Sequence, residues 1–231
     1  MSTHLRQVYA TTWKALLRRR FTIAILVVLP LVLYFARDGV GQSVRALLFG
    51  ITWSTTTVAF YSTMSARNNE PLQRLAGATI PALILGRTTA LVAGGAILAT
   101  LYFLLVMLQL DVNAAQWVLV GYLCAAIVGA CIGSAIGLLV KREVDGVLLI
   151  FMLAGLQIVS DPNGLLGQAL PYWSTMEIVT FAVDGPAAAS PGLGLAHAAV
   201  LAAIGLSVTL LLTRRRLPAQ RTLQVQRLTH T

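Results

Sequence analysis

Few residues in this sequence could catalyse hydrolysis or bind a nucleotide, and their spacing suits neither activity. Ser134 and His197 both lie in apolar runs, where a membrane-embedded serine protease would hold its nucleophile and its base. Ser134 is about 17 residues from the outer end of its run and His197 about five from the outer end of its own, so roughly 18 Å of helix rise separates them. Because no hydrogen bond spans that distance, we expect no catalytic residue. His197 is then a neutral packing residue or a contact on a substrate path.

Sites for ATP and for metal ions are missing from the sequence. A phosphate-binding loop needs a glycine-rich turn followed by Gly-Lys-Ser or Gly-Lys-Thr, but the only lysines are Lys14 after Trp13 and Lys141 after Val140. No Cys-x-x-Cys, His-Glu-x-x-His or other cluster of metal ligands occurs. We therefore predict that the chain is not an enzyme and that it binds no cofactor and no metal itself. We also expect no charged side chain deep inside an apolar run, which disfavours an ion-coupled carrier.

Composition places the chain among integral membrane proteins. Of its 231 residues, 57% are hydrophobic and only 11% are charged, and the mean hydropathy is +0.79; a typical globular domain has about 25% charged residues. The net charge of +9 would suit nucleic acid. However, the basic residues stand at the ends of apolar runs rather than in a stripe with interleaved aromatic residues, so we exclude a nucleic-acid partner and expect membrane lipids instead.

Six apolar runs predict an all-α membrane protein with six transmembrane helices, because a helix satisfies its own backbone hydrogen bonds inside a bilayer. About 20 residues cover the hydrocarbon core, so the first and fifth runs are short. The runs are residues 21–36, 44–66, 81–110, 117–140, 146–160 and 193–213. Together they define a transmembrane domain over residues 21–216.

The basic residues orient these helices. With the N-terminus in the cytoplasm, Arg37 and Arg45 are the only two of the 17 lysines and arginines that fall outside. The positive-inside rule therefore predicts that both termini are cytoplasmic. The preference for arginine over lysine suggests a bacterium of high GC content, and hence a multi-pass protein of a bacterial inner membrane.

Three segments outside the spans have patterns of their own. Residues 1–20 carry apolar side chains at helical spacing and basic ones on other faces, which predicts an amphipathic helix in the cytoplasmic headgroup layer, with a frayed basic tail as the alternative. Residues 161–191 are apolar for an outer loop and rich in glycine and proline, which predicts short helices re-entering the outer leaflet. Residues 217–231 form a short polar cytoplasmic tail.

The loop between the second and third runs predicts a short cytoplasmic helix over residues 68–77. Asn68 or Asn69 would cap this helix, Pro71 would start it and Gly77 would end it. The apolar side chains at positions 72, 75 and 76 fall on one face. Such a helix either rests on the lipid headgroups or docks a cytosolic partner.

Small residues repeat every four positions along the fourth run, which places them on one stripe of a helix. A stripe of this kind lets helix backbones approach closely in lipid, and we expect it to pack within the bundle or at a dimer interface. Its members are Gly121, Ala125, Gly129, Gly133 and Gly137.

Taken in order, these features resemble the ABC-2 type membrane subunits, the permease half of type V ABC exporters. The resemblance covers nearly the whole chain: the N-terminal amphipathic helix with Trp13 and the arginines at 18–20, six spans, the loop helix, and an apolar re-entrant segment before the last span. In that family the loop helix is the coupling helix that docks on the ATPase. Its place is taken here by Arg67, Glu70, Leu72, Arg74 and Leu75.

The resemblance also implies a gate, partners and a function. The sequence Leu-Pro-Tyr-Trp at residues 170–173 is similar to the family's Leu-Pro element, which implies an outer gate at Leu170, Pro171, Trp173 and Glu177.

The implied partners are two copies of a cytosolic ABC ATPase, which holds ATP and Mg, and a second permease copy or a sister permease. The implied function is export of an amphiphilic or hydrophobic drug, antibiotic or lipid. The residues leave open an ATP-independent membrane scaffold or an intramembrane enzyme.

Overall fold

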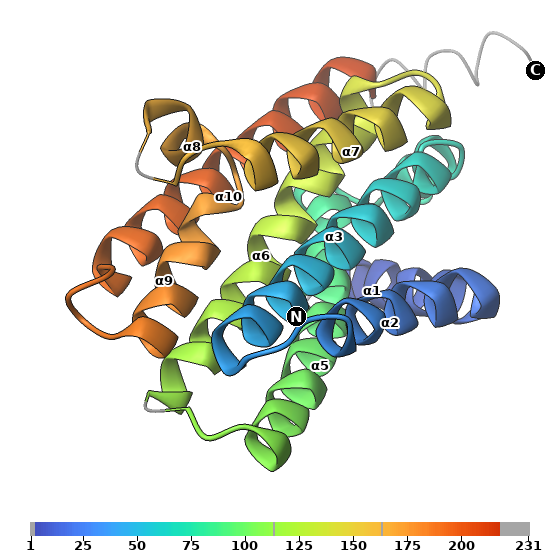
Figure 1. The fold of residues 1–231 in the computed structure, drawn as a ribbon. Helices are drawn as coiled ribbons and strands as arrows, with labels where there is room; N and C mark the ends of the chain where they lie inside the picture. Colours follow the sequence, from blue (N-terminus) through green and yellow to red (C-terminus); the bar gives the residue numbers. More distant parts are fainter. Residues whose placement is uncertain (1–2, 113, 163, 218–231) are drawn as a thin grey trace, which may run out of the picture.

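The computed structural model describes residues 3–112, 114–162 and 164–217, and within them every regular element is an α-helix (Figure 1). The helices are α1 (Thr3–Arg18), α2 (Arg20–Phe35), α3 (Val40–Ala66), α4 (Glu70–Leu75), α5 (Ile80–Gln109), α6 (Ala115–Leu139), α7 (Glu143–Val159), α8 (Leu165–Ala169), α9 (Trp173–Asp184) and α10 (Pro191–Arg216). The all-α prediction is confirmed for this part of the chain. Apart from Leu217, the predicted tail lies outside the described residues.

Each of the six predicted apolar runs forms most of a helix of its own: α2, α3, α5, α6, α7 and α10. Within the described residues, α5, α6 and α10 are long and apolar enough to cross a membrane. The 16 residues of α2 and the 17 of α7 rise only about 25 Å, less than the roughly 30 Å of a bilayer core. The 27 residues of α3 include many serines and threonines. The structure therefore supports three candidate spans, and the six-span topology stays a prediction.

The centre of the bundle is α6. Figure 1 shows it between α3 on one side and α9 and α10 on the other, and it packs on all three and on α5. The largest cluster of buried apolar side chains surrounds its first half and includes Leu47 of α3, Tyr122 of α6 and Val179 of α9. The buried Tyr122 hydroxyl within this core is paired, since it donates to the Val44 carbonyl at 3.1 Å.

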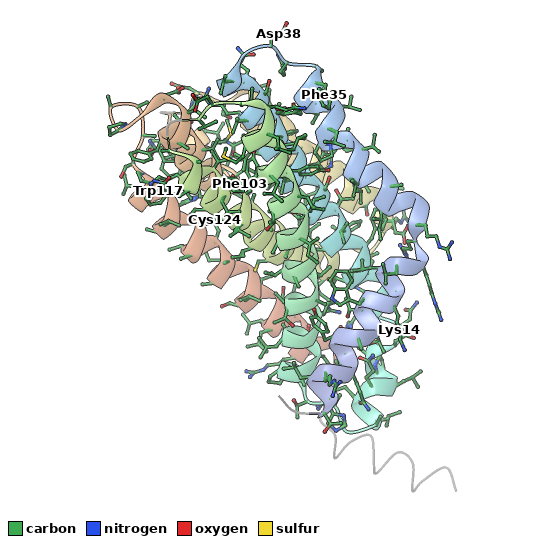
Figure 2. The ribbon with its side chains drawn as sticks, turned by 90° about the horizontal axis from the view of Figure 1, so that it is seen from below. Lys14, Phe35, Asp38, Phe103, Trp117 and Cys124 are labelled. Atoms are coloured by element: carbon green, nitrogen blue, oxygen red, sulfur yellow. The ribbon has the colours of Figure 1, made fainter. Side chains whose placement is uncertain are left out.

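The bundle has two distinct ends. At one end α1, α5, the turn after α4 and the residue after α10 meet in a buried cluster of Val8, Ala78, Leu83 and Leu217. At the other end the Tyr34 hydroxyl of α2 donates to Gln109 of α5 at 2.9 Å, and Arg45 of α3 pairs with Asp184 of α9. Figure 2 shows Asp38 and Phe35 at this second end and Lys14 toward the first. We call them the α4 end and the Asp38 end.

The first helix lies along the first turns of α5. A side chain at Gly86 would meet Val8 of α1, and one at Gly94 would meet the ring of Trp13, so the two helices advance in the same direction. Val8 and Thr12 are buried there. The amphipathic pattern of residues 1–20 does form a helix, and α5 rather than solvent covers part of its apolar side. Its place in the headgroup layer stays a prediction.

The apolar segment 161–191 folds into the two helices α8 and α9. The second of these packs on α3, α6 and α10. Its last residue, Asp184, lies at the Asp38 end, whereas the hydroxyl of Tyr172, just before its first residue, approaches Thr56 near the middle of α3 at 3.4 Å. Short helices with breaks are thus present as predicted, and their entry into a leaflet stays a prediction.

Candidate functional site

The loop helix α4 begins and ends close to where the sequence pattern predicts. Asn69 precedes its first turn, but its side chain makes no capping hydrogen bond, so the predicted cap is absent. Pro71 lies within that turn, where a missing backbone donor costs nothing. Gly77 follows with φ of +94°, which glycine adopts without strain, and this turns the chain back toward α5. A hydrogen bond of 3.0 Å from the Ala78 amide to the Gln73 carbonyl closes the turn.

Glu70 joins α4 to two of the long helices. One carboxylate oxygen accepts a hydrogen bond of 2.6 Å from Nη1 of Arg87 in α5, and the other accepts one from Nη2 of Arg216 at the end of α10. Glu70 is 1% exposed and Arg87 is 3% exposed, so their pair is shielded from water. Separating such a pair would leave an uncompensated buried charge. The position of α4 relative to α5 and α10 is therefore strongly restrained.

Two further arginines lie in or next to α4. Arg74 is buried and donates to the Ala78 carbonyl at 2.8 Å, which ties α4 to the turn that follows it. Arg67, at the end of α3, is half-buried; burial lowers the pKa of its guanidinium, and its Nε has no hydrogen-bond partner among the described residues. Arg67 also interacts electrostatically with Arg216. We call these four arginines and Glu70 the Glu70 cluster, in which guanidinium groups outnumber carboxylates.

The other side of α4 is apolar and faces outward. Leu72 is 65% exposed and Leu75 is 40% exposed. Of the residues predicted to couple to an ATPase, these two leucines are therefore the ones available to a partner. Glu70 and Arg74 instead hold α4 in place from within, and Arg67 is intermediate. The sequence pattern did not separate these two roles.

The small-residue stripe of α6 lies inside the bundle. A Cβ atom at Gly137 would come within 2.8 Å of Thr63 Cβ in α3, and one at Gly121 within 2.6 Å of Val179 in α9. The remaining members, Ala125, Gly129 and Gly133, are also buried. Of the two roles predicted for the stripe, the structure places it in packing within the chain, so α3 and α9 occupy the face that a second copy would need.

The residues predicted for an outer gate are divided between core and surface. Leu170 and Pro171 are buried. The Trp173 ring packs edge to face on the imidazole of His197, with centroids 5.3 Å apart. His197 is thus half-buried and packs on a neighbouring helix, but its Nδ1 has no hydrogen-bond partner among the described residues, and both of its predicted roles stay predictions.

Glu177 fixes the turn that leads into α10. Its carboxylate accepts a hydrogen bond of 2.8 Å from the backbone amide of Ser190, the residue before the first turn of α10. The salt bridge between Arg45 and Asp184 closes the same end of the bundle. The residues predicted for the gate therefore include a buried Leu-Pro segment and one acidic side chain, Glu177, that holds a surface turn.

Ser134 and His197 do not form a catalytic pair. Gly205 of α10 lies against Cys131 of α6. Nearer the start of each helix, Gly194 of α10 and Gly121 of α6 both lie against Ile178 of α9, so α6 and α10 run in the same direction. Measured along the helix axes from the contact between Gly205 and Cys131, Ser134 and His197 are about 16 Å apart. The described residues also hold no group of three or more histidine, cysteine or acidic side chains that could bind a metal ion.

Two members of the Glu70 cluster were missed as site residues by the sequence analysis. Arg87 and Arg216 were treated only as basic residues that orient the spans. Arg87 in fact lies inside the third apolar run, where we expected no charged side chain at depth. The sequence did contain a signal for this pair: Arg87 comes 17 residues after Glu70, the one carboxylate of the preceding loop.

No protein-family model and no curated protein matches the chain. Its function therefore rests on the geometry of the Glu70 cluster, on the distribution of apolar surface and on the ordered features of the sequence.

Proposed function

We propose that this chain is the membrane-embedded permease subunit of an ATP-driven exporter. The observation that carries the proposal is α4, a short helix at the arginine-rich end of the bundle with two exposed leucines on one side and a buried ion-pair cluster on the other. Such a helix suits a partner that binds at the surface and acts on the long helices behind it. The sequence contains no phosphate-binding loop, so ATP and Mg would be held by the partner.

In this proposal the ATPase binds the outward side of α4 through Leu72 and Leu75. Movement of α4 is transmitted through Glu70, because its two carboxylate oxygens bind α5 and α10 separately. Both helices pack on α6 and so reach the centre of the bundle. ATP binding and hydrolysis would then favour alternative arrangements of the permease, as coupled two-state transitions do.

The proposed assembly contains two ATPase subunits and two permease subunits, the second permease being a copy of this chain or a sister chain. Since the α6 stripe is covered within the chain, the second permease would meet another face. Exposed apolar side chains are plentiful on the outer helices, for example Leu104 of α5 and Phe151 of α7. The proposed cargo is amphiphilic or hydrophobic, such as a drug, antibiotic or lipid, moved outward across a bacterial inner membrane.

The proposal is tested by recovering the tagged full-length chain from native membranes in mild detergent and identifying co-purifying proteins by mass spectrometry. We expect a soluble ATPase with Walker motifs in the wild-type sample. Leu72→Asp with Leu75→Asp should remove it without lowering the unfolding temperature of the chain. The matched control is Leu165→Asp, at an 89% exposed leucine of α8, which should retain the ATPase.

Two results would overturn the proposal. One is a chain that emerges alone from several gentle detergents. The other is a double leucine variant that retains the ATPase as well as the wild type does. Either would favour an ATP-independent membrane scaffold over an exporter subunit.

A further inference from the structure

A continuous groove runs between the N-terminal helices and the bundle. Two hollows form it, with volumes of about 130 Å³ and 280 Å³. Both are bordered by α1, α2, α3 and α5, and they share the lining residues Leu16, Ile23 and Val58. An enclosed apolar cavity of about 150 Å³ is already large enough to hold benzene. The larger hollow alone therefore has room for a hydrocarbon segment.

The hollow nearer the α4 end is lined by apolar side chains together with two arginines and several polar side chains. Arg19, which follows α1, donates to the Ser65 hydroxyl of α3 at 2.7 Å, and both residues line this hollow. Arg87 lines it from α5; its Nη1 binds Glu70, whereas its Nη2 is buried with no hydrogen-bond partner among the described residues. A buried donor without an acceptor is costly. Arg87, a side chain that is 97% buried at the border of this hollow, thus has one donor without a partner among the described residues.

The charge balance at this end favours an anion. Glu70 is the acidic residue that lines this hollow, and both of its oxygens already bind arginines. Against this one carboxylate stand Arg19, Arg87 and Arg216, with Arg67 close to the last. Positive charge therefore remains in excess around a partly shielded hollow, where a charge-assisted hydrogen bond is strong.

The hollow farther from the α4 end is apolar. It is lined by Leu26 and Val27 of α2, by Leu98 and Leu101 of α5, and by Gly94, whose missing side chain leaves room beside Trp13. From Arg87 to Leu101 the groove follows α5 for about 20 Å at the rise of a helix. One leaflet of a bilayer core is about 15 Å deep. The groove is therefore long enough to hold an acyl chain whose headgroup lies at Arg19 and Arg87.

We propose that this groove binds one phospholipid of the leaflet at the α4 end, with its phosphate on Arg19 and Arg87 and one acyl chain along α5. From the α4 end inward, the hollow with the arginines comes before the apolar hollow. A phospholipid likewise has its phosphate first and its acyl chain after it. The inference goes beyond the proposed export function and does not depend on it, because it concerns the isolated chain and needs no ATPase.

The test uses the purified full-length chain without any partner. Native mass spectrometry measures the binding of palmitoyl lysophosphatidic acid, of monopalmitoylglycerol, which lacks the phosphate, and of inorganic phosphate, which lacks the chain. We expect the lysophosphatidic acid to bind most tightly. Arg19→Gln should weaken it about tenfold and leave monopalmitoylglycerol unchanged, since one hydrogen bond to a charged group is lost.

Gly94→Leu fills the apolar hollow and should weaken both palmitoyl compounds about tenfold, as expected when two methylene groups lose their burial. The new Cβ itself would lie 3.4 Å from the Trp13 ring, an ordinary contact. The matched control is Gly155→Leu in α7, where nothing lies within 4 Å of a new Cβ. If Gly94→Leu does not fold, Leu101→Trp fills the groove from a half-exposed position.

Three outcomes would overturn the inference. Inorganic phosphate that binds as tightly as the lysophosphatidic acid indicates a free-anion site. Equal binding of the lysophosphatidic acid and monopalmitoylglycerol shows that the arginines do not bind the phosphate. Equal effects of the Gly94 and Gly155 substitutions place the acyl chain outside the groove.

Discussion

The carboxylate of Glu70 lies 2.6 Å from Nη1 of Arg87, with both side chains buried, and the pair joins a surface loop helix to a candidate membrane span. Arg216 occupies the second carboxylate oxygen. One acidic side chain thus fixes the relative positions of α4, α5 and α10. The predictions below begin with this pair.

Replacing Glu70 with leucine should destabilise the chain by about 3–5 kcal/mol, because Arg87 is left buried and without its anionic partner. Thermal unfolding in detergent measures the loss. The double variant Glu70→Leu with Arg87→Leu should recover much of it, since an apolar pair of similar volume often replaces a buried ion pair at little cost.

The control for that prediction is Glu143→Gln, an exposed acidic residue in the first turn of α7. We expect its unfolding temperature to match the wild type. If Glu70→Leu is as stable as Glu143→Gln, the Glu70 cluster does not restrain the bundle and the transmission proposed through it is wrong.

Adding one methyl group to the α6 stripe should force α3 and α6 apart. In Gly137→Ala the new Cβ would come within 2.8 Å of Thr63 Cβ and 2.9 Å of the Phe60 carbonyl oxygen. Overpacking of this kind costs about 1–3 kcal/mol. The same change at Gly155, where space is open, should stabilise the chain by about 0.5–1 kcal/mol through the helix preference of alanine. Equal unfolding temperatures for the two variants would contradict the packing described for the stripe.

The position of α1 on α5 is tested by a pair of glycines on the same helix. In Gly86→Ala the new Cβ would lie 2.8 Å from Val8 Cβ and 2.9 Å from the Leu5 carbonyl oxygen, so α1 must move away. In Gly94→Ala the nearest atom is 3.4 Å away, and α1 should stay in place. Hydrogen exchange over residues 3–18 should rise only in the first variant. A helix that lay free on the headgroups would respond to neither.

Cysteine labelling distinguishes six spans from three. In a background with Cys124 and Cys131 replaced by alanine, Asn68→Cys and Ala187→Cys introduce thiols at two exposed positions. With α5, α6 and α7 all spanning, the two sites lie on opposite sides, and a membrane-impermeant maleimide added to intact cells should label only Ala187→Cys. If only α5 and α6 cross between them, both sites lie on one side. Identical labelling of the two would therefore exclude the six-span topology.

Much of the helical framework could be predicted because it follows from local pattern. The third run was placed at residues 81–110 and the helix covers Ile80–Gln109; the loop helix was placed at residues 68–77 and covers Glu70–Leu75. Apolar run length, proline in a first turn and a glycine with positive φ are properties of neighbouring residues. They are read correctly without knowledge of the fold.

The roles of side chains within the site could not be predicted in the same way. The pattern of α4 separates an apolar face from a polar one but does not say which of the two meets the bundle, so Glu70 and Leu72 looked equally suited to a partner. What separates them is Arg216, which comes 146 residues later and reaches Glu70 only in the folded bundle. Likewise, the stripe of α6 predicted close packing, but not that α3 and α9 would supply its neighbours.

The packing of α6 on α3 also sets an order of events during synthesis. The Thr52, Thr55 and Thr56 hydroxyls of α3 bond to carbonyls one turn earlier in their own helix, so they need no partner from elsewhere. Gly137 is made about 70 residues after Ala66, a delay of roughly 4–14 s at ordinary translation rates. For that interval α3 is without the neighbour on which it packs most extensively. These three hydroxyls are thus satisfied within α3 before α6 is available, and they do not depend on its arrival.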